Sequence, residues 1–96
     1  MSEWVRVATF EADEAAARRM VEEINKEPGP PPEIPAESIR VGYDHENNHV
    51  SVVVRFATEE NLRIGSETLE GMEPPPEANM RRISVEKFEV LLERHA

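Results

Sequence analysis

Apolar and polar residues alternate along three stretches of the chain, residues 3–11, 39–43 and 50–56. A period of two places successive side chains on opposite faces of an extended backbone, so each stretch predicts a β-strand. In two further segments apolar residues recur every three or four positions, which predicts amphipathic helices. Their apolar stripes are Ala17, Met20, Val21 and Ile24 in the first helix, and Leu62, Gly65, Leu69 and Met72 in the second.

Each predicted helix begins after a capping residue, Asp13 in the first and Thr58 in the second. Short polar side chains at this position accept hydrogen bonds from the first-turn N–H groups. Gly65 lies in the middle of the second helix, where glycine costs about 1 kcal/mol relative to alanine. We therefore expect this helix to approach the sheet closely at Gly65.

The last segment of the chain fits two structures. As a helix, residues 84–93 bring four apolar side chains to one side: Val85, Phe88, Leu91 and Leu92. As a strand, residues 81–90 need a bulge near Glu86 and Lys87 to keep their apolar residues in phase. Periodicity alone does not decide between them, and an internal repeat in the chain favours the strand.

That repeat is marked by the sequence PPPE, which occurs at residues 30–33 and 74–77, each time after a helix and before a strand. The repeated order predicts a ferredoxin-like fold, β-α-β-β-α-β. We expect one α+β domain over residues 1–96, with an antiparallel sheet of strand order 4-1-3-2 and both helices on one side. The prolines stiffen the connectors, and recognition of the first run by an SH3-type groove is the alternative.

The segment HENNH, residues 45–49, matches the HExxH motif of zinc proteases. That motif needs both histidines on one helical face and a third protein ligand. Here the segment connects two predicted strands, and Asn47 and Asn48 are a typical turn pair. A hairpin would place His45 and His49 on opposite arms. We therefore predict a turn and no metal site.

The two faces of the predicted sheet differ in character. The more uniformly apolar face is expected to pack against the helices: Val5, Val7, Ile39, Val41, Tyr43, Val50, Val52, Val54 and Phe56. The other face mixes apolar groups with arginines: Trp4, Arg6, Ala8, Phe10, Arg40, Gly42, Ser51, Val53 and Arg55. An exposed apolar patch of this kind marks an interaction site. A two-fold homodimer, sheet on sheet, would cover it, and the unpaired edge strand invites a partner too.

On this second face Arg6, Arg40 and Arg55 are expected to repel one another unless anions lie between them. One interpretation is a set of ion pairs with glutamates of a second subunit, because arginine is common in interface pairing. The other is an anionic or carboxylate-bearing aromatic ligand, bound by the guanidinium groups and stacked on Trp4.

The composition narrows the range of partners. The 96 residues include no cysteine, which excludes disulfides and thiolate chemistry. The formal net charge of −9 repels phosphate backbones and anionic lipid, so neither nucleic acid nor a membrane is an expected partner. The N-terminus has no basic segment followed by an apolar run, so no signal peptide is expected. We expect a cytoplasmic protein.

Three segments together resemble the dimeric α+β barrel superfamily, in particular its small antibiotic-biosynthesis-monooxygenase-like proteins: WVRVATFEA, VVVRFATEENL and RRISVEKFEV. The resemblance implies a two-fold dimer whose sheets face each other and a pocket between sheet and helices. Some relatives oxidise phenolic or quinol substrates without a cofactor, and others degrade haem. The haem-degrading relatives use a histidine on the second helix, which this chain lacks, so no cofactor is expected.

These features predict a small dimeric protein that binds a small aromatic or anionic molecule or acts as a cofactor-free monooxygenase. The alternative is a non-catalytic assembly or interaction module. The candidate binding residues are Trp4, Arg6, Arg40, Arg55, Tyr43 and Asn61, and no catalytic residue is identified. Cofactor-free oxidation needs a base and orienting polar groups, for which Tyr43, Thr9 and Asn61 are the helix-facing candidates. A polar-lined cavity between sheet and helices would favour binding or catalysis over assembly.

Overall fold

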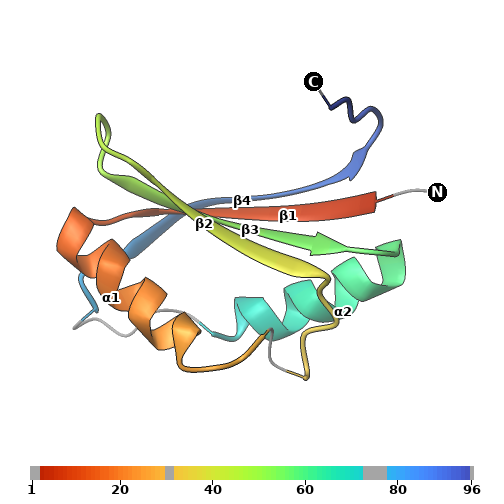
Figure 1. The fold of residues 1–96 in the computed structure, drawn as a ribbon, viewed down its shortest axis with the longest axis horizontal. Helices are drawn as coiled ribbons and strands as arrows, with labels where there is room; N and C mark the ends of the chain where they lie inside the picture. The colour runs from red at the N-terminus through yellow and green to blue at the C-terminus, as the bar shows by residue number, and fades with distance from the viewer. Residues whose placement is uncertain (1–2, 30–31, 73–77, 96) are drawn as a thin grey trace.

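The computed structural model of the protein describes residues 3–29, 32–72 and 78–95. Its elements follow in the order β1 (Glu3–Glu11), α1 (Glu14–Asn25), β2 (Ser38–Asp44), β3 (His49–Phe56), α2 (Glu59–Glu70) and β4 (Arg81–Val90). The strands form an antiparallel sheet of order β2-β3-β1-β4, and both helices lie on one side of it (Figure 1). The α+β fold and its predicted β-α-β-β-α-β order are confirmed. We call the helix-covered side of the sheet the inner face and the opposite side the outer face.

The closing segment is a strand, β4, which pairs with β1 along its whole length. The helical alternative is therefore wrong, and residues 91–95 have no regular structure. The register shifts where Thr9 pairs with Ser84 and Phe10 with Arg82, so Ile83 is the extra residue on β4. The bulge predicted near Glu86 and Lys87 thus lies nearer the start of the strand. Most of the two PPPE segments, residues 30–31 and 74–77, falls outside the described residues.

Both predicted helix caps are present. The Asp13 carboxylate accepts a hydrogen bond of 2.8 Å from the backbone N–H of Ala16. The Thr58 hydroxyl accepts one of 3.0 Å from the N–H of Asn61. Each bond satisfies a first-turn N–H donor that has no partner within the helix. Both first turns also contain glutamates, whose negative charge interacts favourably with the positive end of the helix dipole.

The HENNH segment is the predicted turn, with residues 45–48 between β2 and β3. Asp44 holds it, because its Oδ1 atom accepts hydrogen bonds from the N–H groups of Glu46 (3.0 Å) and Asn47 (3.2 Å). Asn48 has a φ of 56°, in the left-handed region that asparagine tolerates better than most residues. His49 is the first residue of β3, whereas His45 lies in the turn itself and not on the β2 arm as predicted, so the two histidines do not share a helical face.

Two clusters of buried residues hold the helices on the inner face. The first lies under α1: Ala12, Ala16, Ala17 and Val50. The second lies beside α2: Ile34, Val54, Phe56 and Leu62. Alanines let α1 lie close to the sheet, and Gly65 does the same for α2, as predicted. A Cβ atom at Gly65 would overlap the ring of Phe56.

The predicted orientation of β1 was wrong. Cross-strand pairing sets Trp4 opposite Phe56 and Arg6 opposite Val54, so these β1 side chains share the inner face with the core of β3. Ala8 and Phe10 point the same way. The outer face of β1 carries Val5, Val7 and Thr9 instead. The physical reason is that both faces of β1 are partly apolar, so its period of two does not decide which face the helices cover, whereas its pairing with β3 does.

Candidate functional site

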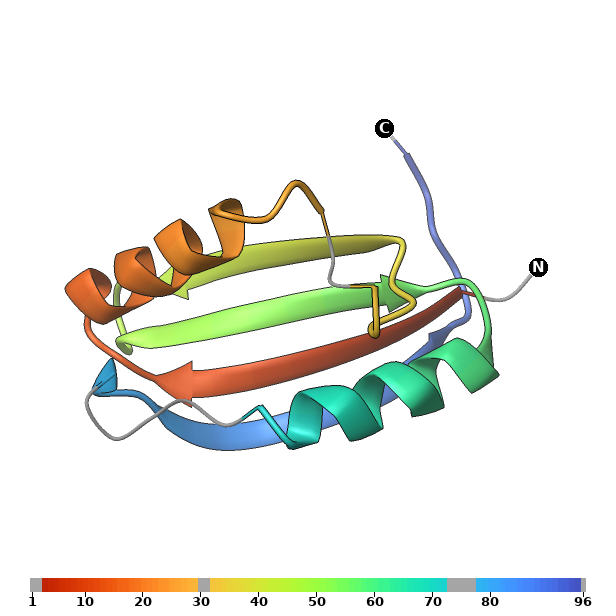
Figure 2. The same cartoon turned by 90° about the horizontal axis from the view of Figure 1, so that it is seen from below.

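A cavity of about 650 Å³ lies between the inner face of the sheet and the two helices. Its described lining comes from the sheet, both helices and the segment before β4: Arg6, Ala8, Phe10, Ala16, Arg19, Met20, Glu23, Ile24, Val52, Leu69, Met72, Ala78, Met80 and Arg82. Most of these side chains are apolar. Figure 2 shows that α1 and α2 run over opposite edges of the sheet and leave its middle strands between them.

The position of the cavity follows from the two clusters. α1 packs mainly on β2, whereas α2 packs on β1 and β3. Between them the sheet presents the small Ala8 beside Val52, its cross-strand neighbour. Neither side chain is long enough to fill the space between the two helices. A cavity of this size falls within the range of about 300–1,000 Å³ typical of small-molecule sites.

Arg6 on the floor of this cavity is the least expected residue of the core. It is only 3% exposed, and its Nε atom has no hydrogen-bond partner. Its guanidinium forms no ion pair with any residue of the described chain. Burial lowers the pKa of Arg6 below its usual value, the Glu70 carboxylate opposes this shift, and the positive charge of Arg82 adds to it. Arginine nevertheless stays protonated in proteins.

Further charged groups surround Arg6. Arg82, at the start of β4, also lines the cavity, and Arg19 and Glu23 line it from α1. Glu70 lies at the end of α2, where its carboxylate is 3.7 Å from the ammonium group of Lys87. The described lining therefore carries three guanidinium groups and one carboxylate. Basic side chains thus outnumber acidic ones on the described lining, although the formal net charge of the whole chain is −9.

The candidate binding residues predicted on one face are distributed over three places. Arg6 lines the cavity, whereas Arg40 and Arg55 lie on the outer face. Arg55 forms an ion pair with Glu3 on that face. Trp4 is half-buried on the inner face and lines a second, shallower hollow of about 520 Å³, with Glu59, Glu60, Leu62, Arg63 and Lys87. The prediction that the three arginines share a face was therefore wrong.

Tyr43 lies on the inner face of β2 and Asn61 in the first turn of α2, and neither residue lines the cavity. The Tyr43 hydroxyl lies 3.1 Å from the carbonyl oxygen of Ala12 and 2.9 Å from Oδ1 of Asn48, and donates its proton to these acceptors. Burial raises the pKa of Tyr43, as do the carboxylates around it. Tyr43 thus joins the hairpin turn to the start of α1. Thr9, predicted on the inner face, lies on the outer face instead, 3.3 Å from the Ser51 hydroxyl.

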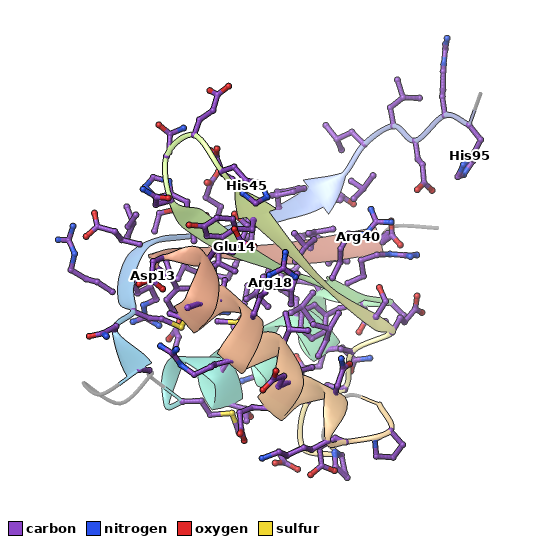
Figure 3. The ribbon with its side chains drawn as sticks, turned by 60° about the vertical axis from the view of Figure 1, so that its left-hand side comes forward. Asp13, Glu14, Arg18, Arg40, His45 and His95 are labelled. Atoms are coloured by element: carbon purple, nitrogen blue, oxygen red, sulfur yellow. The ribbon has the colours of Figure 1, made fainter. Side chains whose placement is uncertain are left out.

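The histidines do not converge. Figure 3 shows His45 beside Glu14 at the start of α1, with Nδ1 and the carboxylate 3.7 Å apart, whereas His95 lies on the C-terminal tail. The ring of His45 also meets Tyr43 edge-on, with centroids 4.9 Å apart. Within residues 3–29, 32–72 and 78–95, no group of three or more histidine, aspartate or glutamate residues is arranged to hold a metal ion.

Several lining residues were not predicted: Arg19, Met20, Met80 and Arg82. Met20 and Met80 carry a sequence signal, since unbranched methionine side chains adapt to irregular apolar surfaces. For Arg19 and Arg82 the sequence gives no such signal, because their place on the lining depends on how the helices pack against β4.

Comparison of the chain with protein-family models, curated proteins and solved structures finds no match. In the described part of the chain, neither helix is long and apolar enough to cross a membrane. The function must therefore be inferred from the geometry of the site.

Proposed function

We propose that this protein binds a small molecule in the cavity between its sheet and its helices. The observation that carries this proposal is a mainly apolar space of about 650 Å³ that the side chains leave unfilled. The pocket is open to solvent, since Arg19, Glu23 and Met72 on its lining are exposed, so its apolar side chains are in contact with water. A bound molecule would remove this apolar surface from water, which is favourable.

Binding is better supported than oxidation. General acid–base chemistry needs a titratable group within hydrogen-bond distance of the reacting atoms. Glu23 is the single carboxylate on the described lining, and this lining includes no histidine, tyrosine or serine. A cofactor-free monooxygenase would have to use Glu23 as its base. A binding role requires nothing beyond the cavity itself.

The experiment compares two alanine-to-leucine variants. Ala8 is buried on the cavity floor, and Ala8→Leu would add an isobutyl group to that space. Ala15 is exposed on α1, so Ala15→Leu adds the same group outside the cavity. The probe is N-phenylnaphthylamine, a neutral aromatic amine whose fluorescence rises in an apolar site. Circular dichroism checks that both variants are folded.

We expect wild type and Ala15→Leu to bind the probe with equal affinity. A folded Ala8→Leu should bind it at least about tenfold less tightly, because the added isobutyl group and the probe would occupy the same space, and overpacking is costly. Equal binding by all three proteins would show that the probe binds outside the cavity and would contradict the proposal. So would a wild-type protein that does not bind the probe at all.

We further propose that the outer face forms a homodimer. Arg40, Val53, Val7 and Glu86 pair in one row across the sheet, from edge strand β2 to edge strand β4. The ends of this row carry opposite charges, and its centre is apolar. Arg40 and Glu86 are both exposed and form no ion pair within the described part of the chain.

Such a row is complementary to a second copy of itself. A two-fold axis parallel to the strands would set Arg40 over Glu86 of the other protomer, and Val53 over Val7. An axis across the strands would set Arg40 over its own copy, which like charges disfavour. The first arrangement keeps the strands of the two sheets nearly aligned, as in most sheet-on-sheet packing. It also leaves the inner-face cavity free.

Exposed apolar side chains extend the same surface. Phe88 on the outer face of β4 is 45% exposed, and Leu91 and Leu92 beyond it are 88% and 72% exposed. Burial of this patch contributes roughly 25 cal/mol for each Å² removed from water. Pairing through the free edge of β4 is the other way to form a dimer, and it would use the backbone rather than these side chains.

A further inference from the structure

We infer that the molecule bound in the cavity is an organic anion with an apolar body, and that Arg6 binds its charged group. This inference rests on the proposed binding function and names the class of ligand. Its basis is the buried guanidinium on the cavity floor, which no described residue neutralises at hydrogen-bond distance.

The first step is the free-energy cost of a buried Arg6 guanidinium that has no partner. A buried charge without a partner is strongly unfavourable, because it loses its hydration and gains no compensating bond. Replacing such a group by an apolar one of similar size is often neutral or stabilising. Arginine at this position therefore works against the stability of the empty protein, and a perturbed, buried charge in a cavity indicates a functional site.

The second step is whether the chain itself neutralises Arg6. Glu70 is the carboxylate whose negative charge raises the pKa of Arg6. Its carboxylate is 3.7 Å from Lys87, which is the cross-strand neighbour of Arg6 on β4. Glu70 is therefore shared between two cations and makes no hydrogen bond to Arg6. The Nε atom of Arg6 is buried without a partner, and no hydrogen bond within the described chain uses the two terminal nitrogens, so these nitrogens are the donors for a ligand.

The third step is the chemistry of the ligand. A guanidinium presents donors in a planar fork that matches a carboxylate or sulfonate, and Arg19 adds a second guanidinium to the same lining. The remaining surface is apolar, and Met20, Met72 and Met80 can adapt to an aromatic or aliphatic body. A neutral molecule would leave Arg6 unpaired, whereas a polyphosphate would leave the apolar lining unused.

The test uses two probes that differ by one charged group. Anilinonaphthalenesulfonate is N-phenylnaphthylamine with an added sulfonate. Both are titrated into wild type, Arg6→Met and Arg18→Met, with circular dichroism as the check of folding. Arg18 is exposed on α1, where it pairs with Glu14 at 2.8 Å and does not line the cavity, so Arg18→Met removes the same charge elsewhere.

We expect wild type to bind the sulfonate more tightly than the neutral probe. Arg6→Met should weaken sulfonate binding by about 10- to 100-fold, the range for one charge-assisted hydrogen bond or a bidentate pair, with little effect on the neutral probe. Arg18→Met should change neither affinity. A second variant, Glu70→Gln, removes the competing carboxylate and should strengthen sulfonate binding severalfold, whether or not Arg6→Met folds.

The contradicting outcomes separate this inference from the proposed function. If the cavity binds the neutral probe but shows no preference for the sulfonate, the ligand class is wrong and the binding function stands. The ligand class is also wrong if Arg6→Met and Arg18→Met reduce the affinity for the sulfonate equally, or if Glu70→Gln lowers that affinity. If wild type binds neither probe, both proposals fail.

Discussion

The ring of Phe56 occupies the space that a side chain at Gly65 would need. A Cβ atom built on Gly65 would lie 2.6 Å from Cζ of Phe56 and closer still to Cε1. Phe56 is fully buried. The bare backbone at Gly65 is thus what brings α2 onto the sheet.

Overpacking usually costs about 1–3 kcal/mol, and the gain of about 1 kcal/mol in helix propensity offsets part of this cost. We therefore expect Gly65→Ala to destabilise the protein by up to about 2 kcal/mol. Urea denaturation measures the difference. Gly29→Ala is the control, because nothing lies within 4 Å of a Cβ at that position. A Gly65→Ala protein as stable as wild type would show that α2 can shift without cost.

Tyr43 is expected to act in stability and not in binding. Tyr43→Phe removes the hydroxyl that joins Ala12 to Asn48 and should cost about 0.5–1.5 kcal/mol, as for one hydrogen bond. The affinity for N-phenylnaphthylamine should stay unchanged, because Tyr43 does not line the cavity. A Tyr43→Phe variant with wild-type stability that no longer binds the probe would show that Tyr43 belongs to the binding site.

Asp44 makes the hairpin turn sensitive to acid. Hydrogen bonds from the side chain and N–H of Asn47, and from the N–H of Glu46, lower the pKa of Asp44. The carboxylate therefore contributes stability that is complete above the unfolded pKa of about 3.9. That contribution is lost as the pH falls through the lower pKa of the folded state.

Asp44→Asn should accordingly be less stable than wild type at neutral pH, and the difference should shrink below about pH 4. Unfolding free energies between about pH 2 and 6 test this. Glu46→Gln removes a neighbouring carboxylate that accepts no hydrogen bond within the described chain, and serves as the control. A stability difference that does not change with pH would contradict the role given to Asp44.

The proposed dimer predicts a charge reversal that can be rescued. Arg40→Glu or Glu86→Arg alone would set like charges opposite each other twice per dimer, and should raise the dissociation constant about tenfold or more. The double variant restores opposite charges and should recover most of the affinity. Sedimentation equilibrium gives the three constants. A monomeric wild type, or a double variant no better than the single ones, would contradict this interface.

The sequence was informative where one local signal decides the structure. Local backbone structure alone explains the roles of the helix caps Asp13 and Thr58 and of the asparagines in the hairpin turn. Gly65 in the middle of a helix likewise predicted a close approach of that helix to the sheet. β1 was different, because both of its faces are partly apolar and a period of two does not say which one is buried. The lone Arg6 argued for the outer face, and only the pairing with β3 shows otherwise.

The cavity could be anticipated only as a general location between sheet and helices. Its walls depend on α1 and α2 lying over opposite edges of the sheet, which the spacing of residues within each helix does not encode. Arg82 joins the lining because the bulge at Ile83 sets the phase of β4. Such relations between elements are properties of the packed chain.

The most direct test of the binding site uses the methyl groups of its methionines. Met20 lines the cavity from α1, Met72 from the segment after α2, and Met80 from the segment before β4. In a methyl NMR titration with N-phenylnaphthylamine, we expect these three signals to shift together and to show contacts with the probe, while methyl signals of Leu91 and Leu92 stay unchanged. Shifts confined to Leu91 and Leu92, with the three methionines unaffected, would contradict a binding site between the sheet and the helices.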